Sequence, residues 1–211
     1  MTENSIVLAI AKDLFDRGKS VIGVVSCQSG DGATHAIRTV ADGLRAYQTD
    51  WRILLVDANF AHPSLSEFAE PGTRGWAEQA AEETPPSPSH DITTAQHPRI
   101  EILPAVSGAA APKIHLDQAR LSWLRQVLAQ ARQNFDVVLV DLPPVLQGDA
   151  EAQAIAPLLD AVLLVVKAGK TRKPVISRAL GILEGADSKP AGMILNQRRM
   201  LIPKWIYQRF F

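Results

Sequence analysis

Two glycines and a hydroxyl residue occur at the spacing of a loop that could hold phosphate. The run from Val21 to Val25 is apolar and predicts a buried strand, and Gly30, Gly32 and Thr34 follow it before a helical pattern begins. In such a loop, backbone N–H groups and the helix N-terminus attract phosphate oxygens, and the hydroxyl can hold Mg²⁺. The predicted cofactor-binding residues are therefore Gly30, Asp31, Gly32, Ala33 and Thr34.

The loop lacks the cation that such a site normally carries. Phosphoryl transfer depends on neutralising phosphate charge, and a lysine usually precedes the hydroxyl residue. Here that position is Ala33, and Cys27 stands where the first glycine of the pattern is expected. His35 is short and mostly neutral at pH 7, and Arg38 lies a helical turn further on. Neither is expected to replace the lysine.

Two aspartates end further apolar runs, at 52–57 and 136–141. Ligands of an open α/β sheet bind at the carboxyl ends of its strands, so Asp57 and Asp141 should converge with the loop. Carboxylate and hydroxyl oxygens suit Mg²⁺, which makes Thr34, Asp57 and Asp141 the predicted metal ligands. The two aspartates are also the residual catalytic candidates. A purely structural role for Asp141, as a hydrogen-bond acceptor at a strand end, is the alternative.

Strands and helices alternate along the chain, which predicts a three-layer, doubly wound α/β fold with a mostly parallel sheet. A Pro-rich stretch cannot continue a helix or pair in a central strand, so 79–98 is predicted to be a surface loop. The domain plan is an N-terminal helix at 1–19, the α/β domain at 20–197 and a tail at 198–211. The predicted strands are 21–26, 52–57, 100–104, 136–141, 161–166 and 191–195, and the main helices are 34–47, 118–134, 151–158 and 174–184.

The composition narrows the function classes. The chain has 22 basic and 22 acidic residues, so no overall field would steer it to nucleic acid. Its one cysteine excludes an internal disulfide framework and fits a reducing cytosol. No apolar run reaches the roughly 18 residues of a membrane span, and no signal peptide is apparent. We expect a cytoplasmic protein that does not bind nucleic acid.

On these motifs the chain resembles the cytoplasmic domain of bacterial tyrosine kinases that control capsule and exopolysaccharide synthesis, and more distantly the partition and septum-placement ATPases. The kinase loop reads approximately Ser-x-x-Pro-Gly-Glu-Gly-Lys-Ser, which aligns with Ser26–Thr34. The kinase motif Asp-x-Asp-x-Arg-x-Pro aligns with Asp57–Pro63, and Asp-x-Pro-Pro is present as Asp141–Pro144. The resemblance covers about residues 20 to 197 and implies a P-loop NTPase-like fold.

Several features of that family are missing together. Ala33 replaces the lysine, Asn59 replaces the second carboxylate, Ala61 replaces the arginine, and Tyr207 alone represents the family's tyrosine-rich tail. We therefore expect a pseudokinase, a catalytically inactive accessory or scaffold protein that requires no cofactor and binds ATP or ADP and Mg²⁺ only weakly. Two alternatives stay open. One is a divergent ATPase or tyrosine kinase whose site is completed in trans, and the other is a partition-like positioning ATPase.

The tail combines cations with aromatic rings, a mixture suited to a membrane protein or an anionic membrane surface. A last helix packed on the domain is the alternative. The resemblance implies as partner a polysaccharide chain-length regulator or a glycosyltransferase complex. That partner would hold the protein at the cytoplasmic face of the inner membrane, and homo-oligomerisation is left open. The candidate docking residues are Arg198, Arg199, Lys204, Trp205, Tyr207, Arg209, Phe210 and Phe211.

Overall fold

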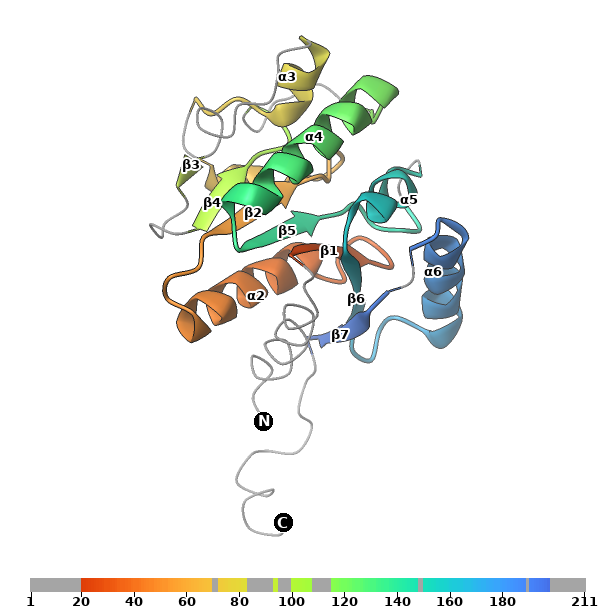
Figure 1. Cartoon of the computed structure of the whole chain (residues 1–211). Helices are drawn as coiled ribbons and strands as arrows, with labels where there is room; N and C mark the ends of the chain where they lie inside the picture. Colours follow the sequence, from red (N-terminus) through yellow and green to blue (C-terminus); the bar gives the residue numbers. More distant parts are fainter. Residues whose placement is uncertain are drawn as a thin grey trace, which may run out of the picture.

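A seven-stranded sheet forms the centre of the molecule in the computed structural model, which describes residues 20–69, 72–82, 93–94, 100–107, 115–147, 150–188 and 190–197 (Figure 1). The order across the sheet is β3-β4-β2-β5-β1-β6-β7. Six strands run parallel, and β3 pairs antiparallel with β4 at one edge. The strands are β1 (Val21–Ser26), β2 (Ile53–Asp57), β3 (Thr93–Thr94), β4 (Ile100–Leu103), β5 (Val137–Asp141), β6 (Ala161–Lys167) and β7 (Gly192–Asn196).

Helices cover both faces of this sheet. One face packs against α3, α4, α5 and α6, and the other packs against α2 (Figure 1). The central strands β1, β2 and β5 are buried along their whole length, which explains why their sequences are apolar at every position and not only at alternate ones. The helices are α2 (Ala33–Tyr47), α3 (Trp76–Ala81), α4 (Gln118–Asn134), α5 (Glu151–Ile155) and α6 (Lys173–Gly185), with 3₁₀ turns η1 (Ser66–Phe68) and η2 (Ala156–Leu158).

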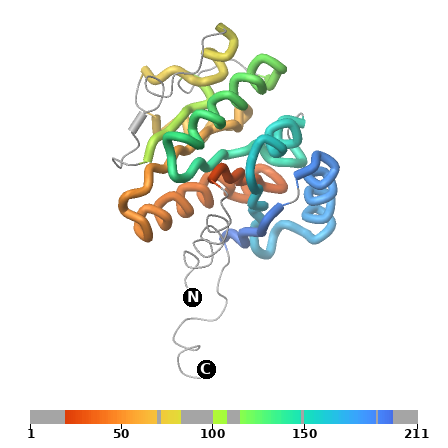
Figure 2. Tube along the Cα trace, viewed as in Figure 1, coloured from red at the N-terminus to blue at the C-terminus, as the bar shows by residue number. Residues whose placement is uncertain are grey.

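The strand order brings the predicted site residues to one edge of the sheet. Strand β1 lies between β5 and β6, and β5 lies between β1 and β2, as the colours of the trace in Figure 2 also show. The register places Asp57 directly opposite Asp141, and Asp141 opposite Val24 near the end of β1. Because β1, β2 and β5 are parallel, the loop after β1 and both aspartates lie at the same carboxyl edge.

The predicted fold class is confirmed, and each predicted strand matches an observed one to within a residue at either end. The predicted helix at 151–158 is α5 followed by the 3₁₀ turn η2, because Pro157 has no N–H for an α-helical bond. Among the described residues, no helix has both the length and the apolar character needed to span a bilayer.

The prediction of a loop over the whole of 79–98 is wrong at two points. Residues 79–81 complete α3, because Trp76, Ala77 and Ala80 are buried and hold this short helix against the core. Thr93 and Thr94 form β3 by pairing with Ile102 and Glu101. The predicted helix at 1–19, the tail at 198–211 and most of the remaining loop lie outside the described residues.

Candidate functional site

The loop between β1 and α2 has the backbone of a phosphate cradle. Gly30 and Gly32 have φ angles of 83° and 93°, which glycine adopts without strain. A Cβ on Gly32 would lie 2.1 Å from Nδ2 of Asn196, so this glycine also makes room for a neighbouring strand end. Gly32 is the N-cap of α2, and the first N–H groups of a helix have no partner within the helix. They are therefore available to an anion.

Side chains from β6, from β7 and from the turn after β6 hold this loop in shape. Asn196 donates from Nδ2 to the Asp31 carbonyl at 2.9 Å, and Lys167 donates from Nζ to the Gly30 carbonyl at 3.2 Å. The Asp31 side chain is turned toward the turn after β6, where its Oδ1 accepts a hydrogen bond from Thr171 Oγ1 at 3.0 Å. The loop is thus preformed by contacts that involve no ligand.

Asp141 is the predicted residue that the structure joins directly to the loop. It is fully buried, and its Oδ2 accepts a hydrogen bond from Thr34 Oγ1 at 2.7 Å. Burial raises the pKa of Asp141 to about 7; the Thr34 hydroxyl lowers this pKa, and the charge of Asp57 raises it. Its Oδ1 has no hydrogen-bond partner among the described residues. A buried oxygen in that state, beside a hydroxyl, fits a site that could hold Mg²⁺.

Asp57 lies beside Asp141 but is already satisfied by protein donors. Its Oδ1 accepts from Asn59 N at 3.1 Å, and its Oδ2 accepts from Ser66 N and Ser66 Oγ at 2.9 and 3.0 Å. Burial raises the pKa of Asp57 to about 6, against the lowering effect of these hydrogen bonds. The carboxylate therefore holds together the turn after β2. Asn59 acts in the same turn, because its Oδ1 accepts from His62 N at 3.2 Å.

His35 and Arg38 are the first basic side chains that follow Ala33 on α2. Ala33, the first residue of α2, is 8% exposed and belongs to the hydrophobic cluster between α2 and the sheet. The Arg38 guanidinium lies 4.0 Å from the centre of the Phe68 ring, which engages its charge away from the loop. His35 is exposed on the first turn of α2. The contact with Phe68 holds Arg38 away from the loop, and the expectation that neither side chain takes the lysine's place stays a prediction.

Lys167 and Asn196 contact the loop, and the sequence motifs did not single them out as site residues. Their positions in the sequence could have indicated a role in the site, because Lys167 and Asn196 end their strands just as Asp57 and Asp141 do. The sequence distance explains the omission, because each bond joins residues more than 130 positions apart. Lys167 is the cation in the described part of the chain that hydrogen-bonds to the loop.

Other chemistry is not supported at this edge. Cys27 is buried, and burial, helped by the charge of Asp31, raises the pKa of its thiol to about 11. A protonated thiol is a poor nucleophile, so Cys27 acts as a packed apolar residue. Within the described ranges, no group of three or more His, Cys, Asp or Glu side chains could hold a metal ion. Any Mg²⁺ would therefore rest on Asp141, Thr34 and a ligand's own oxygens.

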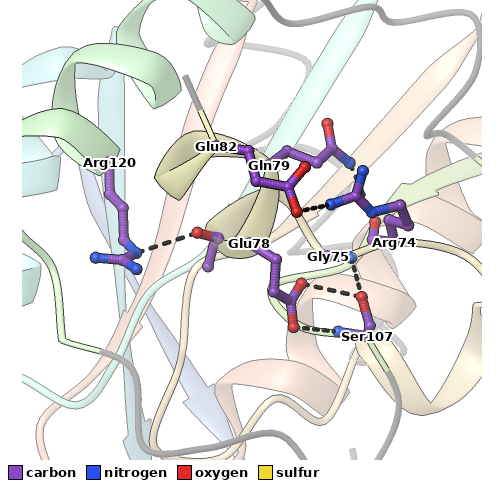
Figure 3. Close-up of polar contacts among 8 residues, drawn as sticks. Arg74, Gly75, Glu78, Gln79, Glu82, Ser107 and Arg120 are labelled. Carbon is purple, nitrogen blue, oxygen red and sulfur yellow. Dashed lines mark hydrogen bonds and ion pairs between the residues drawn. The ribbon is translucent and has the colours of Figure 1, made fainter. Parts of the chain in front are cut away.

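A braced corner behind β2 fixes the position of Asp57. Trp76 Nε1 donates to the Asp57 carbonyl at 2.7 Å, and the Trp76 ring stacks on Trp123 with centroids 5.9 Å apart. Glu78 accepts from both N and Oγ of Ser107 at 3.0 Å, as Figure 3 shows. Arg120 donates from Nε to the Ala77 carbonyl at 3.1 Å (Figure 3). These contacts tie α3, α4 and the loop after β4 to the end of β2.

Comparison with known proteins finds relatives among bacterial tyrosine kinases and exopolysaccharide transport proteins. No protein-family model matches the chain. The chain is 33% identical over 199 residues to the succinoglycan biosynthesis transport protein ExoP of Rhizobium meliloti, a match that spans 93% of this chain and 23% of that protein. It is 23% identical to the tyrosine-protein kinase YwqD of Bacillus subtilis, with 88% of this chain and 75% of the kinase matched.

Solved structures agree on the fold. The kinase domain of the Escherichia coli tyrosine kinase ETK superposes with a TM-score of 0.77 at 22% identity, over 93% of this chain and 77% of that one. A ParA family ATPase from Chlorobium tepidum superposes with a TM-score of 0.64 at 18% identity, over 85% and 74% of the two chains. At these identities the superpositions establish a shared P-loop-type α/β fold.

The fold and the strand-end site define a P-loop-type α/β domain. Homologues of this chain include the bacterial tyrosine-protein kinases YwqD and CpsD and the transport protein ExoP, and its structural neighbours include a ParA family ATPase. This confirms the resemblance inferred from the motifs. The chain spans only 23% of the length of ExoP, so the activities of that whole protein do not transfer to it directly.

Proposed function

We propose that this protein is a catalytically inactive, kinase-like accessory protein of bacterial exopolysaccharide biosynthesis or export. The observation that carries the proposal is a preformed phosphate loop in which the uncharged Ala33 occupies the position of the cation. Groups that stabilise charge in phosphoryl and acyl transfer contribute ~10³-fold or more in rate. A loop without that charge can keep its backbone shape, but it lacks the group that stabilises charge during phosphoryl transfer.

The second motif supports the same conclusion. Asn59 and Ala61 stand where the kinase motif has an acid and an arginine. Asn59 and Asp57 instead hold the turn between β2 and η1 through hydrogen bonds to backbone N–H groups. Asp57 and Asn59 therefore stabilise the fold, as expected of a protein that retains the kinase architecture without catalysing phosphoryl transfer.

Nucleotide binding is a separate part of the proposal. The loop N–H groups, Thr34 and the open oxygen of Asp141 form a site that would take Mg²⁺ with ATP or ADP weakly and without turnover. Bound Mg²⁺ would neutralise phosphate charge there. Asp57 would contribute little, because both of its oxygens already accept hydrogen bonds.

The proposed partner is a membrane polysaccharide chain-length regulator or a glycosyltransferase complex, met at the cytoplasmic face of the inner membrane. The similarity to ExoP supports this assignment, because ExoP is a succinoglycan biosynthesis transport protein and this chain aligns with 23% of its length. The proposed docking segment is the basic, aromatic stretch 198–211, which lies outside the described residues.

A complementation experiment tests the accessory role. In a strain that lacks this gene, the variants Thr34→Ala and Asp141→Asn should restore exopolysaccharide yield as well as the natural sequence does, because a scaffold does not need the site's chemistry. Immunoblotting would verify equal amounts of each protein. Loss of exopolysaccharide with both variants at normal protein levels would refute the accessory role.

A second candidate is a divergent ATPase or tyrosine kinase whose missing cation comes from another subunit or a partner. The open Oδ1 of Asp141 favours it, because an unpaired buried oxygen suits a site that is completed on assembly. Calorimetry decides between the two. A dissociation constant for Mg·ATP below about 10 µM only with the partner present would favour this enzyme. A partition-like ATPase would instead change its sedimentation profile when ATP is added.

A further inference from the structure

The turn that joins β6 to α6 concentrates positive charge. Residues 167–173 contain four cations and no acid, although acidic and basic residues are equal in number over the whole chain. Lys170, Arg172 and Lys173 are exposed. Within the described part of the chain, none of these three side chains forms an ion pair. Their charge is therefore directed to solvent.

Hydrogen bonds hold this turn in one conformation. Thr171 N donates to the Lys167 carbonyl at 3.0 Å, and Thr171 Oγ1 accepts from Lys167 N at 3.0 Å. The same hydroxyl donates to Asp31, which joins the turn to the phosphate loop. The cations are thus displayed on a fixed support, which lowers the entropy lost when they meet a partner.

The charge also lies at the unfavourable end of a helix. Helix α6 begins at Lys173, its first turn has no acidic residue, and no side chain caps its N-terminus. A helix N-terminus carries partial positive charge, so cations there repel it and an external anion would relieve the repulsion. Together with the exposed cations, this makes the turn complementary to a negatively charged surface.

Exposed apolar side chains lie next to the turn on the neighbouring edge strand. Strand β7 pairs with β6 so that Asn196 lies opposite Lys167, and Figure 1 shows β7 and α6 on the same side of the molecule. Met193 and Leu195 on this strand are 42% and 54% exposed. After Gln197 the sequence continues directly into two arginines and then into the aromatic tail. Cations flanked by apolar side chains are typical of surfaces that bind anionic bilayers.

We propose that a basic corner, formed by Lys170, Arg172, Lys173, Met193 and Leu195, docks on an anionic phospholipid bilayer. Lys167 contributes less, because its ammonium group donates to the Gly30 carbonyl. The exposed Met193 and Leu195 favour a bilayer over an acidic protein segment, which would use the cations alone. This inference goes beyond the proposed function, since the contact is with lipid and needs no protein partner.

Vesicle sedimentation with the full chain tests the basic corner. Vesicles of phosphatidylglycerol and phosphatidylcholine should bind the protein, pure phosphatidylcholine vesicles should not, and added salt should weaken the binding. Lys170→Gln should reduce the partition coefficient about fivefold, the factor that corresponds to about 1 kcal/mol per cation at such a surface. Lys170→Gln/Lys173→Gln should reduce it roughly 25-fold by the same factor.

Arg125→Gln is the matched control, since Arg125 is exposed on α4 and its loss changes the net charge equally. It should leave vesicle binding unchanged, and circular dichroism would verify that all variants are folded. Equal binding to both kinds of vesicle, or equal losses for Lys170→Gln and Arg125→Gln, would overturn the proposal. So would binding of the natural sequence to polyglutamate without binding to the anionic vesicles, which would indicate an acidic protein partner.

Discussion

The Thr34 hydroxyl still reaches the Asp141 carboxylate, at 2.7 Å, while the residue before Thr34 carries no charge. The site therefore has a hydroxyl–acid contact next to a position that carries no cation. Asp57 and Asn59 accept hydrogen bonds from backbone N–H groups in the turn after β2. At the scale of single residues, the hydrogen bonds of Asp57 serve the fold, whereas Oδ1 of Asp141 has no hydrogen-bond partner among the described residues and could meet a ligand.

Restoring the cation tests whether the cradle itself is intact. Ala33→Lys should tighten Mg·ATP binding at least about tenfold, equivalent to about 1.4 kcal/mol, because the loop N–H groups are already in place. Isothermal titration calorimetry measures the change. Ala33→Gln is the neutral control of similar length and should give no gain. An unchanged affinity in the lysine variant would show that the loop has also changed in shape.

The two buried aspartates should make stability depend on pH. Their pKa values are raised to about 6 and about 7, so the folded protein keeps protons that the unfolded chain releases. The free energy of unfolding should therefore be greatest near pH 4 and should decrease as pH rises through 7. Since one pKa unit corresponds to about 1.4 kcal/mol, the decrease should be on the order of a few kcal/mol.

Asp141→Asn isolates the contribution of one group to this pH dependence. Asparagine does not titrate, so urea unfolding of the variant should show a shallower decrease in stability between pH 5 and 8, by about 1 kcal/mol or more. If the variant and the natural sequence lose stability in parallel over this range, the raised pKa of Asp141 is wrong.

At the scale of elements, the bracing of β2 by α3 and α4 is the main feature that the sequence patterns did not indicate. The central strands were predictable because runs that are apolar at every position are typical of parallel strands buried on both faces. Helix α3 and strand β3 have six and two residues, so their local signals are weak. They exist because Trp76 is buried in the core and because β4 offers a free edge.

Trp76→Phe tests the brace. It removes the donor to the Asp57 carbonyl and leaves a buried acceptor unpaired, which should lower the free energy of unfolding by about 1–3 kcal/mol. Urea denaturation measures the loss. Trp123→Phe changes a ring in the same stack but keeps the hydrogen bond to the Asp57 carbonyl. Comparing the stability losses of the two variants therefore distinguishes the contribution of the hydrogen bond from that of ring packing. A Trp76→Phe variant as stable as the natural sequence would show that the bond contributes nothing.

At the scale of the whole molecule, the parallel sheet brings the ends of β1, β2, β5, β6 and β7 together at one edge. The convergence of the phosphate loop with Asp57 and Asp141 was predictable, because that edge is where such sheets carry their ligands. The contacts of Lys167, Thr171 and Asn196 with the loop were not, since they depend on which strands lie next to β1 and β6. The chain thus joins a preformed nucleotide-type loop to a basic corner on one side of the sheet.

Phosphoryl transfer measured with the purified full chain tests directly whether the protein is catalytically inactive. The protein would be incubated with γ-labelled ATP and Mg²⁺, and both released phosphate and phosphotyrosine would be quantified beside the Asp141→Ala variant. We predict that the activity of the natural sequence does not exceed that of this variant, because Ala33 leaves the transferred phosphate without a cation. ATP turnover or autophosphorylation that clearly exceeds the Asp141→Ala background would contradict it.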